Sequence, residues 1–245
     1  MAVDATGPAA QIQAAICEQL GVETVVRLTC PRRPRPVPVS VLAAAHAIAA
    51  SCSRPRTRRS PRAERLLHWP TVKRLWLLRH AKSSWDDPGL PDPDRPLAPR
   101  GRRAADLLAA HLATSDVRPS VVLCSSSLRT RQTLAAILPA LGDALQIRIE
   151  RALYVAGAAQ LLERLRRLPN RVSSAMLIAH NPGIQDLAVA LAAGGPALAG
   201  LGEKFPTGAL AGLELDVERW PDLDHGTATA TALVTPRSLE SRAEA

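Results

Sequence analysis

The chain has 245 residues, 47% hydrophobic and 22% charged, a composition typical of a globular protein with one sizeable core. Aromatic residues make up only 2%, which argues against nucleic-acid binding by base stacking, and no apolar stretch is long enough for a membrane span. The net charge of +9 is concentrated at one end, because residues 1–70 hold 10 Arg and Lys against 4 Asp and Glu. Neither a membrane nor a nucleic acid is therefore expected as a partner.

Residues 1–71 are predicted to be a basic, Pro/Arg-rich extension. One short helix is predicted at 9–20, and the runs CPRRPRPVPV and SRPRTRRSPR follow it. Such runs cannot bury enough apolar surface to offset the entropy of ordering. Three interpretations stay open: a disordered basic arm, a targeting segment, or a gene start placed too early, since Val72 directly precedes a clean strand.

Alternating strands and amphipathic helices begin at residue 72 and define a predicted domain over 72–236, followed by a flexible tail at 237–245. Strands are predicted at 72–78, 121–124, 146–150, 174–179, 209–217 and 229–236, and helices at 99–113, around 134–141, at 158–168 and after Asn181. Asn181 is the predicted N-cap of the last helix and Pro182 its first residue. The alternation predicts an α/β fold of three layers, α/β/α, with a largely parallel sheet.

Polar groups suited to phosphate follow three of these strands. Arg79 and His80 follow the first, Arg129 lies in the turn after the second, and His180 follows the fourth. Ligands of such sheets bind beyond the carboxyl ends of the strands, where helix N-termini also favour anions. Two arginines and two histidines would offer a phosphoryl group fork-shaped donors and a nucleophile. We therefore expect these segments to converge on a phosphate site.

Five spaced motifs carry a family resemblance. They are LLRHAKSSWDD, DPDRPLAPRG, SSSLRTRQT, LYVA and AHNPG, in this order. Together they resemble the histidine phosphatase superfamily, and within it the SixA-type phosphohistidine phosphatase branch, over about residues 72–235. The resemblance implies a phosphoglycerate mutase-like fold and a phosphatase that needs no metal and no cofactor.

The resemblance also implies roles for the residues at the strand ends. His80 would attack phosphorus and form a phosphohistidine that water then hydrolyses. It must be neutral to attack, and the neighbouring arginines should lower its pKa below the reference value of about 6.5. Arg79, Arg129 and His180 would hold the phosphoryl oxygens and stabilise the charge of the transition state.

The segment after His80 departs from the usual R-H-G signature. Ala81 replaces the glycine, and Lys82 adds a positive charge next to the expected pocket. Lys82, Ser83 and Asp86 complete the predicted substrate-binding set. An acid at position 86 would repel phosphate unless it were paired, and Lys82 is the expected partner.

A general acid is harder to identify. Glu150 lies near where some phosphoester-cleaving relatives carry a glutamate, and there it would protonate a leaving alkoxide. Without such an acid the enzyme would need a better leaving group, such as the imidazole of a phosphohistidine. Arg131 is expected to be solvated, and Asp92, Asp94 and Arg95 are expected to organise the loop beside the pocket.

The leading hypothesis is a phosphatase that removes phosphate from phosphohistidine in proteins. The alternatives are a small-molecule phosphomonoesterase of the same superfamily and a non-catalytic protein that binds phosphoryl groups or polyanions. The expected partner is thus a phosphorylated protein or a small phosphorylated molecule. The four cysteines (Cys17, Cys30, Cys52 and Cys124) have no C-x-x-C spacing, so neither a disulfide framework nor a metal site is predicted, and a cytoplasmic location fits best.

Overall fold

The structure, a computed structural model, describes residues 25–27, 72–143 and 145–243. They belong to a unit formed by Met1–Thr29 and Val72–Ala245, and a second unit, Cys30–Thr71, lies outside the described residues. The helix predicted at 9–20 and the three interpretations of residues 1–71 also lie outside them, apart from strand β1 (Val25–Arg27).

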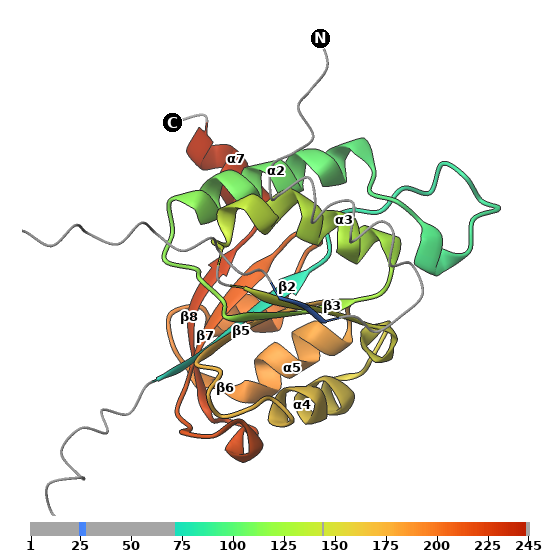
Figure 1. The fold of residues 1–245 in the computed structure, drawn as a ribbon. Coiled ribbons are helices and arrows are strands. Elements are labelled where there is room, and N and C mark those ends of the chain that lie inside the picture. Colours follow the sequence, from blue (N-terminus) through green and yellow to red (C-terminus); the bar gives the residue numbers. More distant parts are fainter. Residues whose placement is uncertain (1–24, 28–71, 144, 244–245) are drawn as a thin grey trace, which may run out of the picture. The chain divides into compact units, whose positions relative to one another are not determined.

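Strands and helices alternate along the described chain (Figure 1). The further strands are β2 (Lys73–Arg79), β3 (Val121–Ser125), β4 (Gln146–Glu150), β5 (Ser174–Ala179), β6 (Ala192–Gly194), β7 (Leu210–Leu215) and β8 (Ala228–Val234). The helices are α2 (Pro99–Ala113), α3 (Leu128–Ile137), α4 (Ala158–Arg166), α5 (Gly183–Leu191), α6 (Leu198–Glu203) and α7 (Pro236–Ala243). Short 3-10 segments are η2 (Asp92–Asp94), η3 (Leu138–Ala140), η4 (Arg151–Leu153) and η5 (Trp220–Asp222).

The strands form one sheet in the order β1-β4-β3-β5-β2-β7-β8-β6. Its centre is parallel, since β4, β3, β5 and β2 all run the same way, whereas β7 pairs antiparallel with both β2 and β8. Arg79 pairs with Ala179, and Cys124 with Ile178. The carboxyl ends of β3, β5 and β2 therefore meet side by side at one edge of the sheet, which positions the residues that follow them.

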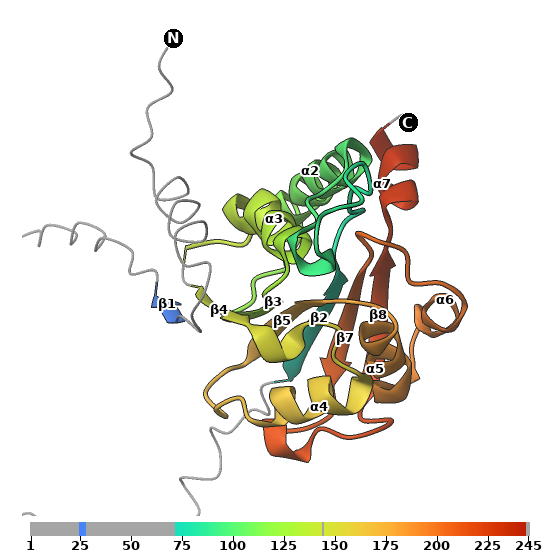
Figure 2. The ribbon, with the colours of Figure 1, turned by 90° about the vertical axis from the view of Figure 1, so that its right-hand side faces the viewer.

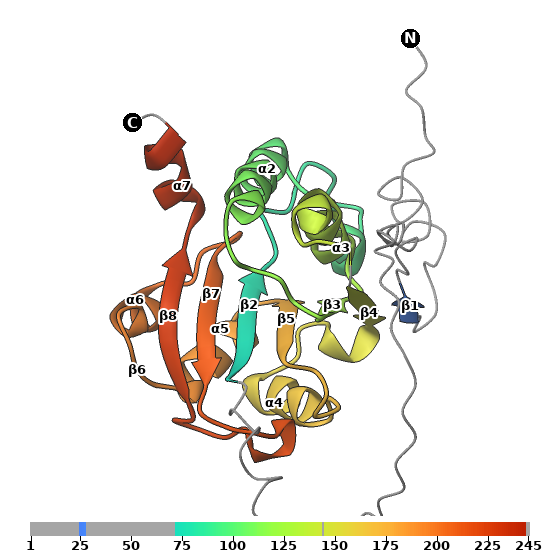
Figure 3. The same ribbon diagram turned by 60° about the vertical axis from the view of Figure 1, so that its left-hand side comes forward.

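Helices cover both faces of the sheet, as Figures 2 and 3 show: α2, α3 and α7 on one face, α4, α5 and α6 on the other. The alternation of β2 explains this arrangement. Leu75 and Leu77 pack into the cluster that contains the α4 and α5 leucines, and Trp76 and Leu78 into the cluster of α2 and α3. The predicted three-layer α/β/α fold is confirmed.

Three predicted details differ from the structure. The helix predicted around 134–141 is α3, which begins at Leu128 and ends at Ile137, where η3 continues the chain. Helix α5 begins at Gly183, with Pro182 at its N-cap position, because the Asn181 amide instead donates to Gln185 Oε1 (2.9 Å). Residues 237–243, predicted as a flexible tail, belong to helix α7, because Leu239 is buried in the same hydrophobic cluster as the α2 leucines.

In the ranges 25–27, 72–143 and 145–243, no helix is long and apolar enough to cross a membrane. In the same ranges no group of three or more His, Cys, Asp and Glu side chains is arranged to hold a metal ion.

Candidate active site

The three strand ends bring the predicted residues together. Arg79 is the last residue of β2 and His80 follows it, while His180 follows the last residue of β5. The rings of His80 and His180 lie 5.0 Å apart between centroids and are tilted by 54°. Arg129 lies in the first turn of α3, just after β3, and it is near enough for its charge to act on both histidines.

The ring of His80 is buried, with 8% of the residue exposed. Its Nδ1 lies 2.8 Å from the carbonyl oxygen of Ala81. A carbonyl can only accept, so Nδ1 carries the hydrogen and Nε2 keeps a free lone pair. Burial, and next the charges of Arg129 and Arg79, lower the pKa of His80 to about 4, against the opposing effects of the Ala81 bond and Asp92. The ring is therefore neutral at pH 7, in the form that can attack phosphorus.

His180 is also buried, with 3% exposed. Its Nε2 lies 2.8 Å from Ser125 Oγ at the end of β3, and the Tyr154 ring stands edge-on at 5.4 Å between centroids. Burial, and next the proximity of His80 and Arg129, lower its pKa to about 3. When Ser125 donates to Nε2 of this neutral ring, the hydrogen is on Nδ1, which is then a donor.

Arg129 is 5% exposed and held by the loop before α2. Its Nη2 lies 2.8 Å from Asp92 Oδ2, its Nη1 donates to the Asp92 carbonyl, and the Tyr154 hydroxyl donates to the same Asp92 carboxylate. The Tyr154 bond, together with Arg129, holds the pKa of Asp92 below its usual range. Asp92 and Tyr154 thus orient the Arg129 guanidinium while its charge stays compensated.

A threonine ties Arg129 to the segment that carries the nucleophile. Thr133 Oγ1 donates to the Arg129 carbonyl (2.7 Å) and accepts from the Ala81 amide (3.1 Å). The first turns of α3 and the residue after His80 are therefore fixed to each other.

Two polar atoms of the site have no partner within the described part of the chain. Arg79 donates from Nη1 to the Phe205 carbonyl (2.8 Å), but its Nε is buried and unpaired, and so is His180 Nδ1. A buried polar group without a partner costs about 1–3 kcal/mol. Both atoms suit an oxyanion, which would satisfy them, so the site fits a phosphoryl group.

The remaining predicted substrate-binding residues have no described hydrogen bond or ion pair with the two histidines, Arg79 or Arg129. Lys82 and Asp86 are exposed, and Ser83 forms an isolated bridge with Leu97. The Asp86 carboxylate accepts from Ser84 Oγ (2.7 Å) rather than from Lys82, so the expected pairing of Lys82 with Asp86 is not present.

Glu150 forms an ion pair with Arg164, whereas its predicted role as a general acid requires it to reach the leaving group of the substrate. Both of its oxygens accept from Arg164 of α4, at 2.6 Å from Nε and 2.5 Å from Nη2. This ion pair ties the end of β4 to α4, and neither oxygen has a described bond to the histidines. The expectation that Arg131 is solvated is wrong, because Arg131 is buried in the first turn of α3.

Sequence reasoning missed three contributors to the site. Tyr154 lies in the LYVA motif, and its position after β4 could have signalled a role beside Arg129. Thr133 lies in the Q-T end of the α3 motif. The Phe205 carbonyl had no signal at all, because a backbone oxygen leaves no trace in residue type.

Comparisons with known proteins agree with this site. A sequence model of the histidine phosphatase superfamily (branch 1) matches residues 75–154. The Mycobacterium tuberculosis protein Rv1276c, itself uncharacterized, is 36% identical over 164 residues, which are 65% of this chain and all of that protein.

Two solved structures extend the likeness over the described domain. The protein histidine phosphatase SixA in complex with tungstate is 27% identical and has a TM-score of 0.52, over 68% of this chain and 99% of that one. An Agrobacterium tumefaciens protein provisionally assigned as the phosphohistidine phosphatase SixA is 28% identical and has a TM-score of 0.57, over 67% and 99%.

Proposed function

The chain belongs to the histidine phosphatase superfamily, and from this premise we propose that it removes the phosphoryl group from phosphohistidine side chains of proteins. It is a SixA-like member with the phosphoglycerate mutase-like fold, and membership supports a phosphatase activity. The observation that carries the proposal is the state of His80: a buried, neutral ring whose Nδ1 is engaged by Ala81, which leaves Nε2 as the nucleophilic atom.

The reaction then takes two steps. His80 Nε2 forms a bond to phosphorus while the P–N bond of the substrate breaks, and the electron pair of that bond returns to the leaving imidazole nitrogen. Water next attacks the phosphorus of phospho-His80, so that inorganic phosphate leaves and the neutral ring is restored. Each step moves one phosphoryl group, and neither needs a redox partner.

The surrounding charges act on the phosphoryl oxygens. Arg79 and Arg129 offer guanidinium donors, and His180 offers Nδ1, toward the charge that develops in the transition state. The Arg79 Nε and His180 Nδ1 atoms, which lack partners in the described chain, would gain them from the substrate. Arg129 would exchange one of its hydrogen bonds to Asp92 for one to the incoming phosphoryl group.

The pairing of Glu150 favours a P–N substrate over a phosphoester. An alkoxide leaving group needs a proton from a positioned acid, and both Glu150 oxygens are engaged by Arg164. The imidazole of a phosphohistidine leaves as a neutral ring when its other nitrogen already carries a proton, so it makes no such demand.

Steady-state turnover of a phosphohistidine-bearing protein and of a phosphoester panel tests the proposal. We expect the wild type to favour the phosphohistidine protein in kcat/KM. His80→Ala should lose turnover of every substrate. Glu150→Gln should leave kcat/KM unchanged for the phosphohistidine protein and for the phosphoesters. A preference for phosphoesters that Glu150→Gln abolishes would instead establish the small-molecule phosphomonoesterase. Tight phosphate binding without turnover would establish a phosphoryl-binding protein.

A further inference from the structure

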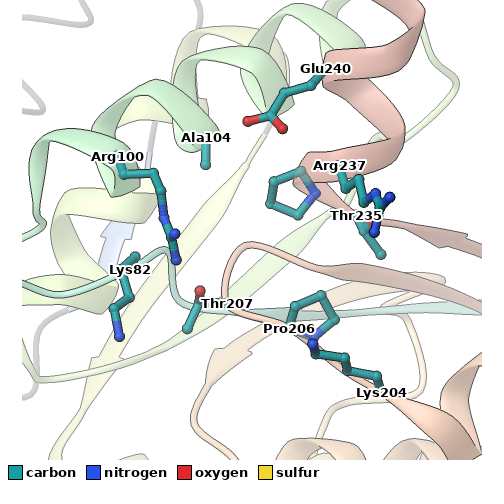
Figure 4. A pocket seen from close by; sticks show the side chains of 10 residues that line it. Lys82, Arg100, Ala104, Lys204, Pro206, Thr207, Thr235, Arg237 and Glu240 are labelled. Carbon is teal, nitrogen blue, oxygen red and sulfur yellow. The ribbon is translucent and has the colours of Figure 1, made fainter.

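A pocket of about 370 Å³ lies next to the candidate active site, between α2, α7 and the segment that leads into β7 (Figure 4). Its lining comes from four separate parts of the chain: Lys82 after β2, Arg100 and Ala104 of α2, Lys204, Pro206 and Thr207 before β7, and Thr235, Pro236, Arg237 and Glu240 at the end of β8 and in α7. A volume of this size suits a small ligand or a few side chains.

The pocket shares its wall with the segment that carries the nucleophile. Lys82 follows His80 by two residues, so their Cα atoms are at most about 7 Å apart. On the other side, the amide of Gly208, next to Thr207, donates to the carbonyls of Arg79 (3.1 Å) and His80 (3.0 Å). One substrate molecule could therefore place one group in the pocket and its phosphoryl group at His80.

The lining is strongly basic. It contains one acid, Glu240, and four cations: Lys82, Arg100, Lys204 and Arg237. None of the four cations forms an ion pair with any residue that the structure describes. In Figure 4 Glu240 projects from α7, on the opposite side of the view from Lys82. Uncompensated positive charges gathered around a concave surface attract anions.

Helix α2 adds to this positive potential. It begins at Pro99, directly before Arg100, and its first turn has neither an acidic residue nor a side-chain cap. The partial positive charge at its N-terminus is therefore not offset by the helix itself. The pocket thus combines four side-chain cations with the positive end of a 15-residue helix.

We propose that this basic pocket is a second anion subsite, which binds a carboxylate or phosphate group of the substrate whose phosphoryl group is transferred to His80. The inference rests on the proposed function and sharpens its substrate class: the preferred substrate carries a second oxyanion close to the reacting phosphoryl group. That oxyanion belongs either to an acidic side chain flanking a phosphohistidine or to a second phosphate on a small molecule.

Two pairs of substrates separate these sources. The first pair is a phosphohistidine peptide flanked by glutamates and the same peptide flanked by glutamines. The second is fructose 1,6-bisphosphate and fructose 6-phosphate. We expect the wild type to favour the more anionic member of one pair by about tenfold in kcat/KM, the effect of one or two charge-assisted hydrogen bonds. A preference within the peptide pair assigns the subsite to acidic proteins, and within the sugar pair to small bisphosphates.

The decisive variant is the double substitution Lys204→Gln with Arg237→Gln, which removes two of the four charges and should abolish the preference. Arg103→Gln is the matched control, since Arg103 is an exposed cation of α2 outside the pocket, and it should keep the preference. An absence of preference in both pairs, or a preference that survives the double substitution, would overturn the proposal.

A binding measurement keeps the subsite separate from the chemistry. Calorimetric titration of His80→Ala with tripolyphosphate should give a Kd that rises about tenfold when Lys204→Gln and Arg237→Gln are added, and stays unchanged with Arg103→Gln. This result would support the subsite even if no phosphohistidine turnover were found. An unchanged Kd in the triple variant would refute the subsite whatever the activity of the wild type.

Discussion

The chemistry of the site depends on how one imidazole ring is held. The R-H pair after a strand predicted both the nucleophile and the direction of its pKa shift. The structure ranks the causes differently from the sequence, because burial lowers the pKa of His80 more than Arg79 and Arg129 do. Burial depends on what packs over the ring, and the residue types near it in the sequence do not show this.

The pKa of about 4 predicts the pH dependence of His80 attack. Above that value the ring is neutral and competent, so kcat/KM for p-nitrophenyl phosphate should stay level from pH 8 to about pH 5 and fall only below it. The profile must be corrected for ionisation of the substrate phosphate. A fall centred near pH 6.5 would show that the ring titrates as a solvated histidine and contradict the described burial.

The geometry of Arg129 predicts that a positive charge at this position is not sufficient for full activity without the planar guanidinium. Asp92 and Tyr154 orient a planar guanidinium, and a lysine cannot place two donors in the same plane. Arg129→Lys should lower kcat by about 100-fold while leaving the circular dichroism spectrum unchanged. Arg103→Lys serves as the control. Near-wild-type kcat in Arg129→Lys would mean that the guanidinium does not contact the reacting group.

Other residues of the site could not be predicted for identifiable reasons. Glu150 was expected as an acid because of its place in the chain, yet Arg164 comes to it from another element, α4. Asp92 was expected only to organise a loop, and its contact with Arg129 spans 37 residues. Such pairings arise from tertiary packing, which local spacing does not encode.

At the scale of elements, the periodic strands and helices from residue 72 onward were predicted to within about two residues, except for α3, which begins at Leu128 rather than near residue 134. The convergence of their ends followed from the rule for parallel sheets. The strand order did not, because β5 lies between β3 and β2 although it follows both in the chain. Elements β6, α6 and α7 were missed, since they are short and their apolar residues show no clear period.

The segment between β5 and α5 holds His180, and Gly183 directly after it has no room for a side chain. A Cβ on Gly183 would collide with the carbonyl oxygen of Ala156, a backbone atom that cannot move without shifting the α4 end of the domain. Gly183→Ala should therefore destabilise the fold by about 1–3 kcal/mol and lower kcat/KM together with it.

Gly202 is the matched control for this prediction. It lies in α6, and a Cβ there would have no atom within 4 Å. Gly202→Ala should leave the free energy of unfolding unchanged or raise it by up to about 1 kcal/mol. Equal unfolding midpoints in urea for the two variants would show that the close approach of Gly183 to Ala156 has no energetic cost.

At the scale of the whole molecule, the buried histidines link folding to pH. His80 has a pKa near 6.5 when unfolded and about 4 when folded, so the unfolded chain binds the extra proton between these values. The contribution of neutral His80 to the free energy of unfolding is complete above pH 6.5 and is lost as the pH falls toward 4. Between pH 7.5 and 5 the loss from His80 should be about 2 kcal/mol.

Urea unfolding, followed by tryptophan fluorescence, to which the buried Trp76 and Trp220 contribute, measures this loss. His80→Gln removes the titrating group, so its stability should fall by about 2 kcal/mol less than that of the wild type between the same two pH values. Parallel losses in the two proteins would show that His80 is not buried in its neutral form.

The distribution of charge also separates the parts of the molecule. Of the net +9, six units belong to residues 1–70, which contain none of the site residues. The charges relevant to phosphate are local: Arg79 at the end of β2, Arg129 in the first turn of α3, and the basic pocket beside them. Overall charge is therefore a poor guide to the substrate, and the arrangement at the sheet edge is a better one.

The central claim is that His80 carries the phosphoryl group between the two steps. The direct measurement is rapid acid-free quenching of the wild type during turnover of a radiolabelled phosphohistidine protein, followed by mapping of the labelled peptide. The expected result is acid-labile, base-stable label on His80, absent from His80→Ala. Turnover at the wild-type rate with no label on His80, or with label on another residue, would contradict the account.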